Sequence, residues 1–397
     1  MKTISYGRQE ISQSDIDSVV KVLQSDYLTQ GPEVKLFEEE FSRYVDSPFS
    51  IAVSNGTAAL HLSALALGVK PGDKVITTPI TFVASANCIR YCGAEILFAD
   101  INPETYLIDF DSVKTILESE PKGSVKGLVL VNFAGKTIDT EKFSSLAKEY
   151  KLWIIEDACH SPGAYFLDST NKEIKSGCSI YSDITVFSFH PVKHIATGEG
   201  GMITTRNEDL YTKILQLRTH GIIKDTIEFK NSIQLAGGIS TYPLWYMEMQ
   251  ELGYNYRMTD FQAALGISQL KRAEFGIKRR HKIVKRYDQA FTNCKFILQK
   301  PVVDISHAYH LYVIEVENRL GLYTYLRENQ IFAQVHYFPC HLMPYYQELG
   351  WKEGDFEYAE KYYENCISLP IYPSLKVDEQ DYVIDKVLEF FNSNRIS

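Results

Sequence analysis

The feature that most constrains the fold is an alternation of short apolar runs with helix-like stretches in the first half of the chain. Runs at 51–53, 74–78 and 127–132 and the segment LWIIEDA read as strands, separated by stretches such as TAALHLSALALG and TEKFSSLAKEY. This alternation predicts an α/β fold with a mostly parallel sheet covered by helices on both faces. The segments SNGT, TPITF, EDACH and SFHPVK follow predicted strands, and ligands of such sheets collect at the carboxyl ends of strands.

The pattern changes from about Met258 onward. Residues 260–291 have helical spacing and a long basic stretch, which predicts a connector helix. Beyond it, HLYVIEV reads as a strand and GLYTYLRENQ as a helix, so a small C-terminal α/β domain is expected. We therefore expect an N-terminal arm at residues 1–25, a large domain at 26–250, and the connector helix with the small domain at 251–397.

Composition excludes several classes of protein. The 397 residues are 45% hydrophobic and 23% charged, which is ordinary for a globular protein, and the net charge of -9 argues against nucleic acid as a partner. No signal-like apolar core begins the chain and no apolar run approaches about 18 residues, so we expect a cytoplasmic protein without a membrane partner. Seven dispersed cysteines, without close pairs, argue against disulfides and against a metal site.

The most informative segment is FSFHPVKHIATGEGGMITT, which contains Lys193. The lysine lies between a strand-like TVFSF and a glycine-rich turn, where backbone can approach a ligand closely. A lysine amine becomes a nucleophile when a cationic or apolar pocket lowers its pKa. The alternative is a surface lysine, which is the usual state of this residue but does not explain the surrounding pattern.

A carboxylate and a histidine follow the predicted strand in IIEDACHS. Asp157 at the end of this strand can face a ligand, and if buried it needs a partner, such as the protonated nitrogen of a pyridine ring. It can equally cap the next segment. His160 can stabilise Asp157 or belong to the core.

The segment SNGTAAL predicts a helix start suited to phosphate. Free N–H groups of the first turn and the hydroxyl of Thr57 can bind an anion, with Ser188 adding a second hydroxyl, although a routine N-cap by Asn55 or Thr57 is the simpler interpretation. Phe82 in TPITF can stack on an aromatic ring or lie in the core.

Two further segments contain candidate ligand-binding residues. In GYNYRMTDFQAALG, Arg257 can reach a phosphate or neutralise a neighbouring charge. The run VHYFPCHLMPYYQ is rich in aromatic residues and histidines, and it predicts either a platform for a sugar or base or a packed surface of tyrosine and proline.

Together these segments resemble the DegT-type family of sugar aminotransferases, which have the type I fold of pyridoxal-phosphate-dependent transferases, as in aspartate aminotransferase. The motifs SNGTAAL, TPITFVASAN, IIEDACHS, VFSFHPVKHIATGEGGMI, RTHGI and GYNYRMTDFQAALGISQL occur in the family's order. The resemblance covers essentially the whole chain.

The resemblance implies a role for each matching residue. Lys193 would form the Schiff base with pyridoxal 5'-phosphate and move the proton, and Asp157 would pair with the ring nitrogen. The remaining expected cofactor contacts are Gly56, Thr57 and Ser188 at the phosphate, Phe82 on the ring, His160 near its hydroxyl group, and Asn255 reaching the neighbouring subunit's cofactor in a homodimer with shared active sites. Expected substrate contacts are Tyr6, Arg8, Lys136, Arg257, His336, Tyr337 and His341.

The resemblance also favours a reaction. Branches of the family that dehydrate sugars replace the Schiff-base lysine by histidine, so Lys193 implies transamination with glutamate as donor. The Gly-Lys pair ending at Lys136, where the family often has Gly-Gln, resembles the branch that acts on UDP-4-keto-6-deoxy-N-acetylhexosamines in pseudaminic acid synthesis. The alternatives are another keto-sugar nucleotide, such as a dTDP-3- or 4-keto sugar, a cofactor-binding regulatory protein without turnover, and a structural α/β scaffold.

Overall fold

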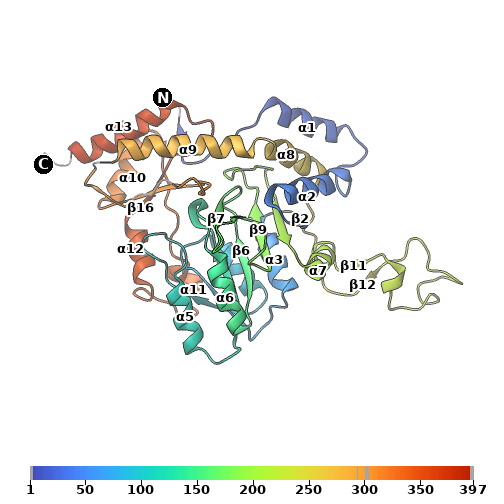
Figure 1. Cartoon of the computed structure of the whole chain (residues 1–397). Helices are drawn as coiled ribbons and strands as arrows, with labels where there is room; N and C mark the ends of the chain where they lie inside the picture. Colours follow the sequence, from blue (N-terminus) through green and yellow to red (C-terminus); the bar gives the residue numbers. More distant parts are fainter. Residues whose placement is uncertain (1–2, 293, 300–303, 394–397) are drawn as a thin grey trace.

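A seven-stranded sheet forms the centre of the molecule (Figure 1). The computed structural model describes residues 3–292, 294–299 and 304–393, so the ends of the predicted arm and small domain lie outside the described residues. In spatial order the strands are β2 (Phe49–Val53), β10 (Gly201–Thr205), β9 (Ile184–Ser188), β6 (Trp153–Asp157), β5 (Val125–Val131), β3 (Lys74–Thr77) and β4 (Glu95–Phe98). Strand β10 runs antiparallel to both β2 and β9, and the other neighbouring pairs in this sheet are parallel. The mostly parallel sheet predicted from the sequence is confirmed.

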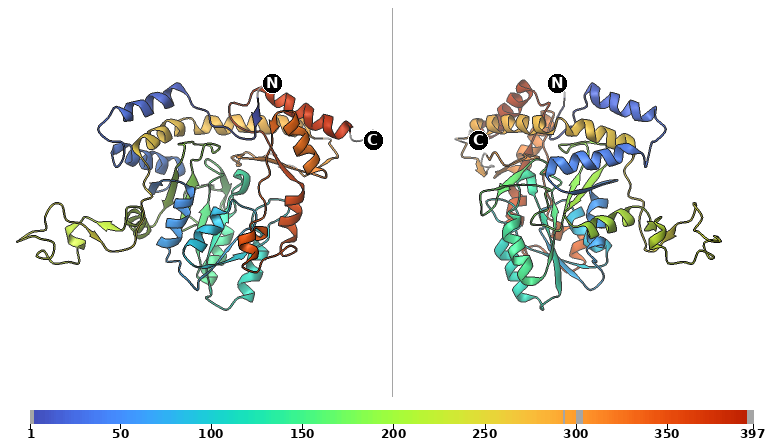
Figure 2. Two further views of the ribbon diagram at one scale, coloured as in Figure 1. Left: turned by 180° about the vertical axis from the view of Figure 1, so that it is seen from behind. Right: turned by 45° about the vertical axis from the view of Figure 1, so that its right-hand side comes forward.

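Helices cover both faces of this sheet (Figures 1 and 2). They are α2 (Pro32–Val45), α3 (Gly56–Ala66), α4 (Ala84–Tyr91), α5 (Phe110–Ser119), α6 (Thr140–Tyr150) and α7 (Glu208–Arg218). Helix α3 packs against α4 and α7, whereas α5 packs against α6. The predicted rhythm of strands and helices therefore corresponds to the observed layers.

Helix α6 illustrates how local sequence sets these elements. The side chain of Asp139 accepts a hydrogen bond from the first turn and caps the helix. Phe143, Leu146 and Ala147 follow at helical spacing and are buried. Lys151 ends the helix in the left-handed conformation. The following apolar residues then enter β6 beside β5.

The C-terminal part of the chain has its own hydrophobic core. Its elements are α9 (Ala273–Ala290), β13 (Ile297–Gln299), β14 (Tyr312–Val316), α10 (Arg319–Glu328), β15 (Ile331–Phe332), α11 (Pro344–Gln347), α12 (Glu357–Asn365), β16 (Cys366–Leu369) and α13 (Val377–Ser393). Strands β13, β14 and β16 form an antiparallel sheet. Near the chain start, β1 (Ile4–Ser5) pairs in parallel with β15, so Ile4 joins this core.

In the structure, the segment predicted as one connector helix forms two helices. Helix α8 (Asp260–Leu270) packs on α2 and shares its core with the large sheet, and α9 begins only at Ala273. The hydrophobic core of the large part thus extends past the expected boundary at residue 250. The division into three regions remains our proposal, with α8 packed on the large domain.

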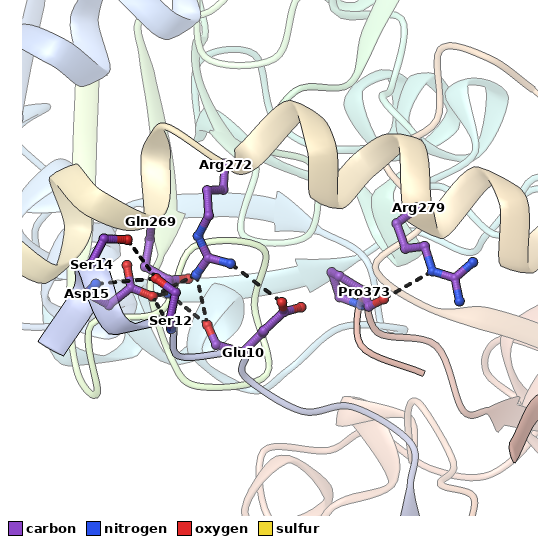
Figure 3. Close-up of polar contacts among 8 residues, drawn as sticks. All are labelled: Glu10, Ser12, Ser14, Asp15, Gln269, Arg272, Arg279 and Pro373. Atoms are coloured by element: carbon purple, nitrogen blue, oxygen red, sulfur yellow. Dashed lines mark hydrogen bonds and ion pairs between the residues drawn. The ribbon is translucent and has the colours of Figure 1, made fainter. Parts of the chain in front are cut away.

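The N-terminal helix α1 (Gln13–Leu23) is anchored at the break between α8 and α9 (Figure 3). The buried Asp15 carboxylate accepts hydrogen bonds from Arg272 Nη2 at 2.7 Å, Gln269 Nε2 at 2.8 Å and the Ser12 backbone at 2.8 Å. Burial acts to raise the pKa of Asp15, but the hydrogen bonds from Ser12 and the charge of Arg272 outweigh it, so the pKa is lowered. Arg272 also bonds the Glu10 carbonyl.

A second segment, residues 222–250, extends away from the molecule (Figures 1 and 2) and is called the arm from here on, as distinct from the predicted N-terminal arm. It begins and ends at the short paired strands β11 (Ile222–Ile223) and β12 (Glu248–Met249). Several of its large apolar side chains are exposed, and Leu244 and Trp245 are among them. The remaining short elements are β7 (Tyr165–Leu167), β8 (Glu173–Lys175), η1 (Phe133–Gly135), η2 (Thr226–Glu228) and η3 (Cys340–Leu342). None of the described helices is both long and apolar enough to cross a membrane.

Candidate active site

A cavity of about 670 Å³ opens where β6 and β9 end. It brings together ten of the residues predicted from the sequence, which are Tyr6, Gly56, Thr57, Phe82, Asp157, His160, Ser188, Lys193, His336 and Tyr337. This position agrees with the expectation that ligands bind at the carboxyl ends of the strands.

Asp157 presents a fixed carboxylate to the cavity. It is the last residue of β6 and only 6% exposed. Its Oδ2 accepts a hydrogen bond of 2.6 Å from Ser85 Oγ, and its Oδ1 accepts one of 3.1 Å from the Cys159 backbone. A carboxylate held in this way is preorganised to bind a cationic N–H group.

Lys193 lies in the turn that follows β9. Its backbone N–H donates to the His190 carbonyl at 2.8 Å, which closes the turn and directs the side chain to the cavity. Burial lowers the pKa of the Lys193 amine, while Cys159 and Asp157 act in the opposite direction. The lowered pKa increases the neutral fraction of the amine, which is the nucleophilic form.

The start of α3 forms one end of the cavity. The Asn55 side chain caps the helix by accepting from the Ala58 N–H at 2.8 Å. The N–H groups of Gly56 and Thr57 also belong to this first turn. N–H groups in the first turn of a helix have no acceptor within the helix. A Cβ on Gly56 would lie 2.9 Å from the Ser188 Cβ, so glycine permits this close approach. The turn and the Ser188 hydroxyl together form a site for an anion.

Aromatic rings form the opposite walls. His160 is buried and hydrogen-bonded through Nε2 to the Tyr337 hydroxyl at 3.1 Å, and its Nδ1 has no partner among the described residues. The Phe82 ring lies 6.3 Å from that of Tyr337 and remains 58% exposed. Burial, followed by the charge of Lys193, lowers the pKa of His160 well below its ordinary value, so its ring is neutral.

The C-terminal part contributes a second group of residues. His336 is buried, its Nδ1 is hydrogen-bonded to Ser368 Oγ at 2.8 Å, and its ring lies 5.0 Å from that of Tyr6. Burial lowers the pKa of His336 to about 3. The run VHYFPCHLMPYYQ therefore contributes to the cavity through His336 and Tyr337.

Five predicted site residues lie outside the cavity of this chain, namely Arg8, Lys136, Asn255, Arg257 and His341. Lys136 forms an ion pair of 3.5 Å with Asp304. The His341 side chain is fully buried and bound to Glu360 at 2.9 Å, so a substrate does not reach it in this conformation. Asn255 and Arg8 are exposed.

Sequence reasoning did not assign roles to Ser85, Thr81 and Cys159. Ser85 donates to Asp157, and its Oγ lies 2.8 Å from Thr81 Oγ1. Thr81 and Ser85 both lie in the quoted motif TPITFVASAN, but their contact forms across the start of α4 at Ala84, which the motif alone does not reveal. Cys159 lines the cavity, and burial raises its pKa, which keeps the thiol protonated.

Comparison with known proteins assigns the family. A model of the DegT/DnrJ/EryC1/StrS aminotransferase family matches residues 9–388. The chain belongs to this family. It is a pyridoxal-phosphate-dependent aminotransferase with the type I fold, as the sequence predicted.

Individual relatives are similar over nearly their whole length. A spore coat polysaccharide biosynthesis protein, SpsC of Bacillus subtilis, is 39% identical over 393 residues, which cover 97% of this chain and 96% of that protein. The UDP-4-amino-4,6-dideoxy-N-acetyl-beta-L-altrosamine transaminase of Campylobacter jejuni is 34% identical over 389 residues, covering 96% of each. PseC of Helicobacter pylori, an aminotransferase involved in pseudoaminic acid biosynthesis, superposes with a TM-score of 0.87 at 28% identity, covering 99% of this chain and 100% of that chain.

The cavity fits pyridoxal phosphate in three respects. The α3 start and Ser188 suit its phosphate, the buried Asp157 carboxylate suits its ring nitrogen, and the Lys193 amine suits its aldehyde. The unpartnered Nδ1 of His160 offers a further polar contact in the same cavity.

Proposed function

We propose that this aminotransferase moves the amino group of glutamate to C4 of a UDP-4-keto-6-deoxy-N-acetylhexosamine. The product would be a UDP-4-amino sugar for pseudaminic acid or a related surface glycan. The cavity that joins Lys193, Asp157 and the anion site is the observation on which the transamination chemistry depends. The choice of sugar is supported by the 34% identity to the altrosamine transaminase, and the similarity to SpsC supports a role in surface polysaccharides.

Lys193 is the proposed catalytic residue. Bound pyridoxal phosphate supplies an electron sink that stabilises negative charge next to the amino nitrogen. Burial lowers the pKa of the Lys193 amine. The neutral Nζ would therefore accept a proton from one carbon and return it to a different carbon. Arginine could not replace it, because a guanidinium stays protonated.

Asp157 has the proposed role of keeping the ring nitrogen protonated. Ser85 and the Cys159 backbone hold its two oxygens, so the carboxylate does not need to reorient on binding. Its low exposure strengthens the attraction to a cation. Phe82 and His160 would fix the plane of the ring, and Gly56, Thr57 and Ser188 would hold the phosphate.

We further propose that the active unit is a homodimer in the cytoplasm. The arm at 222–250 presents apolar side chains to solvent in the single chain, with Ile239 93% and Trp245 78% exposed. Exposed apolar area of this extent is typical of a protein interface. Asn255 follows the arm and would reach the cofactor of the second subunit, while Arg8, Lys136 and Arg257 remain proposed substrate contacts.

The substrate proposal is tested with purified holoenzyme, glutamate and a panel of UDP- and dTDP-keto sugars. We expect the keto oxygen to be exchanged for an amino group and a hydrogen, a mass increase of about 1 Da, only with UDP-4-keto-6-deoxy-N-acetylhexosamines, and NMR of the product should place nitrogen at C4. The Lys193→Ala variant should give no product, and borohydride should attach the cofactor to the Lys193 peptide of the wild type.

Three outcomes would contradict the proposal. Product from a 3-keto but not from a 4-keto sugar would refute the choice of carbon. Preference for a dTDP-sugar would refute the nucleotide. Cofactor binding without turnover of any keto sugar would favour the regulatory alternative.

A further inference from the structure

Three histidines from distant parts of the chain pack in series, beginning with His160 in the wall of the cofactor cavity. The ring centroids of His160 and His310 are 4.3 Å apart with an interplanar angle of 38°, and those of His310 and His194 are 5.7 Å apart. His160 lines the cavity, whereas His310 lies behind it. Within the described residues, no group of three or more His, Cys, Asp or Glu side chains is placed to hold a metal ion. The series therefore calls for a different explanation.

The orientation of His160 depends on the rings around it. Its Nε2 is hydrogen-bonded to the Tyr337 hydroxyl, and its Nδ1 has no partner in the described part of the chain. One hydrogen bond leaves a ring free to rotate about that contact. The rings of His310 at 4.3 Å, Tyr337 at 6.1 Å and Phe133 at 6.2 Å also surround it, and that of His310 is the nearest of the three. A flat ring in contact with another restricts its tilt.

The position of His310 is itself fixed by the turn that contains Gly135. The backbone N–H groups of residues 308 and 311 donate to the carbonyls of Gly135 and Ala134 at 2.9 and 3.1 Å. Gly135 has a φ of 103°, and a Cβ there would lie 2.8 Å from the His310 amide nitrogen. Only glycine allows this close approach, so the turn after β5 determines how near the His310 backbone packs to it.

Two cationic or potentially cationic side chains hold the same segment. The buried Arg280 of α9 donates through Nη1 to the Tyr309 and His310 carbonyls at 3.1 and 3.3 Å. His194, the residue after Lys193, donates through Nε2 to the carbonyl of residue 308 at 2.9 Å. The segment 308–311 thus connects the C-terminal part to the turn of the catalytic lysine.

Burial keeps the ring of His310 neutral, because it is the largest cause that lowers its pKa. Lys193, His160, His194 and Arg280, which face it from three parts of the chain, lower the pKa further. A neutral ring contacts His160 without electrostatic repulsion. The contact therefore persists over the range of pH in which an aminotransferase operates.

We propose that His310 is a positioning residue that supports His160. By fixing His160, it would set the tilt of the cofactor ring that His160 contacts. The inference rests on the proposed binding of the cofactor in this cavity, but not on the identity of the sugar. It assigns His310 no proton transfer. Its ring acts through His160, as a flat support fixed by Gly135 and Arg280.

The test compares His310→Leu with His310→Phe in the holoenzyme. Leu removes the flat ring and Phe retains it. We expect His310→Leu to reduce the induced circular dichroism of the bound cofactor and to lower kcat about 3- to 10-fold with little change in KM for glutamate. His310→Phe should restore both within about twofold. The circular dichroism needs no sugar, so a wrong substrate assignment does not affect it.

A double-mutant cycle identifies the route of the effect. If His310 acts through His160, the effects of His310→Leu and His160→Gln on kcat and on the dichroism should be strongly non-additive. Additive effects would overturn the proposal, as would a Phe variant as defective as the Leu variant. If His310→Leu does not fold, His310→Gln replaces it in the same cycle.

His281→Leu is the matched control. His281 also packs a ring against this segment, 5.0 Å from Tyr309, but does not line the cavity. We expect no change in cofactor dichroism for this variant. An equal change would mean that any loss of packing disturbs the cofactor, and it would overturn the specific role of His310.

Discussion

Replacing Asp157 by asparagine tests whether the buried carboxylate holds the cofactor ring. The change preserves the shape of the side chain and removes its charge. Ser85 and the Cys159 backbone remain in place to hold the new amide, so the cavity should keep its form. The loss is then confined to the attraction between the carboxylate and the protonated ring nitrogen.

The magnitude follows from the burial of Asp157. Because the side chain is only 6% exposed, solvent screens the contact weakly, and a charge-assisted hydrogen bond in such a place contributes about 2 kcal/mol. This corresponds to about 30-fold weaker cofactor binding. We also expect kcat to fall, since an unprotonated ring withdraws electrons less strongly.

The assay is equilibrium titration of the apoenzyme with pyridoxal phosphate, followed by the absorbance of the lysine-bound cofactor. Glu156→Gln is the control, because Glu156 is also a buried carboxylate of β6 but bonds Asn132 and Thr185 instead of lining the cavity. Its cofactor affinity should stay within about twofold of wild type. An Asp157→Asn variant with unchanged affinity would refute the assigned role.

Two further predictions concern the N-terminal helix and the arm. Asp15→Asn removes the partner of Arg272, which is 30% exposed, so the free energy of unfolding should fall by about 2 kcal/mol. Because the pKa of Asp15 is lowered in the folded state, this difference should be full above about pH 4 and shrink as pH falls through the folded-state pKa, as measured by urea unfolding from pH 7 to pH 3. The Leu244→Ser/Trp245→Ser double variant should weaken the proposed dimer at least tenfold in sedimentation experiments, since each side chain contributes about 1.5 to 3 kcal/mol when buried. Ile305→Ser, at an equally exposed position outside the arm, should leave the dimer intact, and a dimer indifferent to the arm variant would contradict the proposed interface.

The site residues that the sequence predicted are marked by patterns in the residues immediately around them. Asp157 and Ser188 end apolar strands, and Lys193 precedes a glycine-rich turn, so strand periodicity alone places all three at one edge of the sheet. Gly56 follows a helix cap, which is likewise readable within a few residues. These are features whose geometry depends on their immediate neighbours.

The remaining parts depend on contacts between distant segments. The contact between His160 and His310 requires the segment 308–311 to pack on the turn after β5, and no local pattern encodes that packing. Lys136 forms an ion pair with Asp304, far along the chain, and no local pattern predicts that contact. The break in the expected connector helix lies where Arg272 turns to Asp15, which is also a tertiary contact.

The pairing of β1 with β15 has a consequence for how the chain is made. Ile4 is synthesised before the strands of the large sheet, yet its partner Ile331 is synthesised only after all of them. Tyr6, which lines the cavity, lies just beyond this pairing and takes its position with it. The strands at 49–205 can assemble during translation, whereas the N-terminal segment must wait without a partner. The cavity is therefore completed only after β15 is synthesised, and a nascent chain truncated before β15 would contain Lys193 but no finished site.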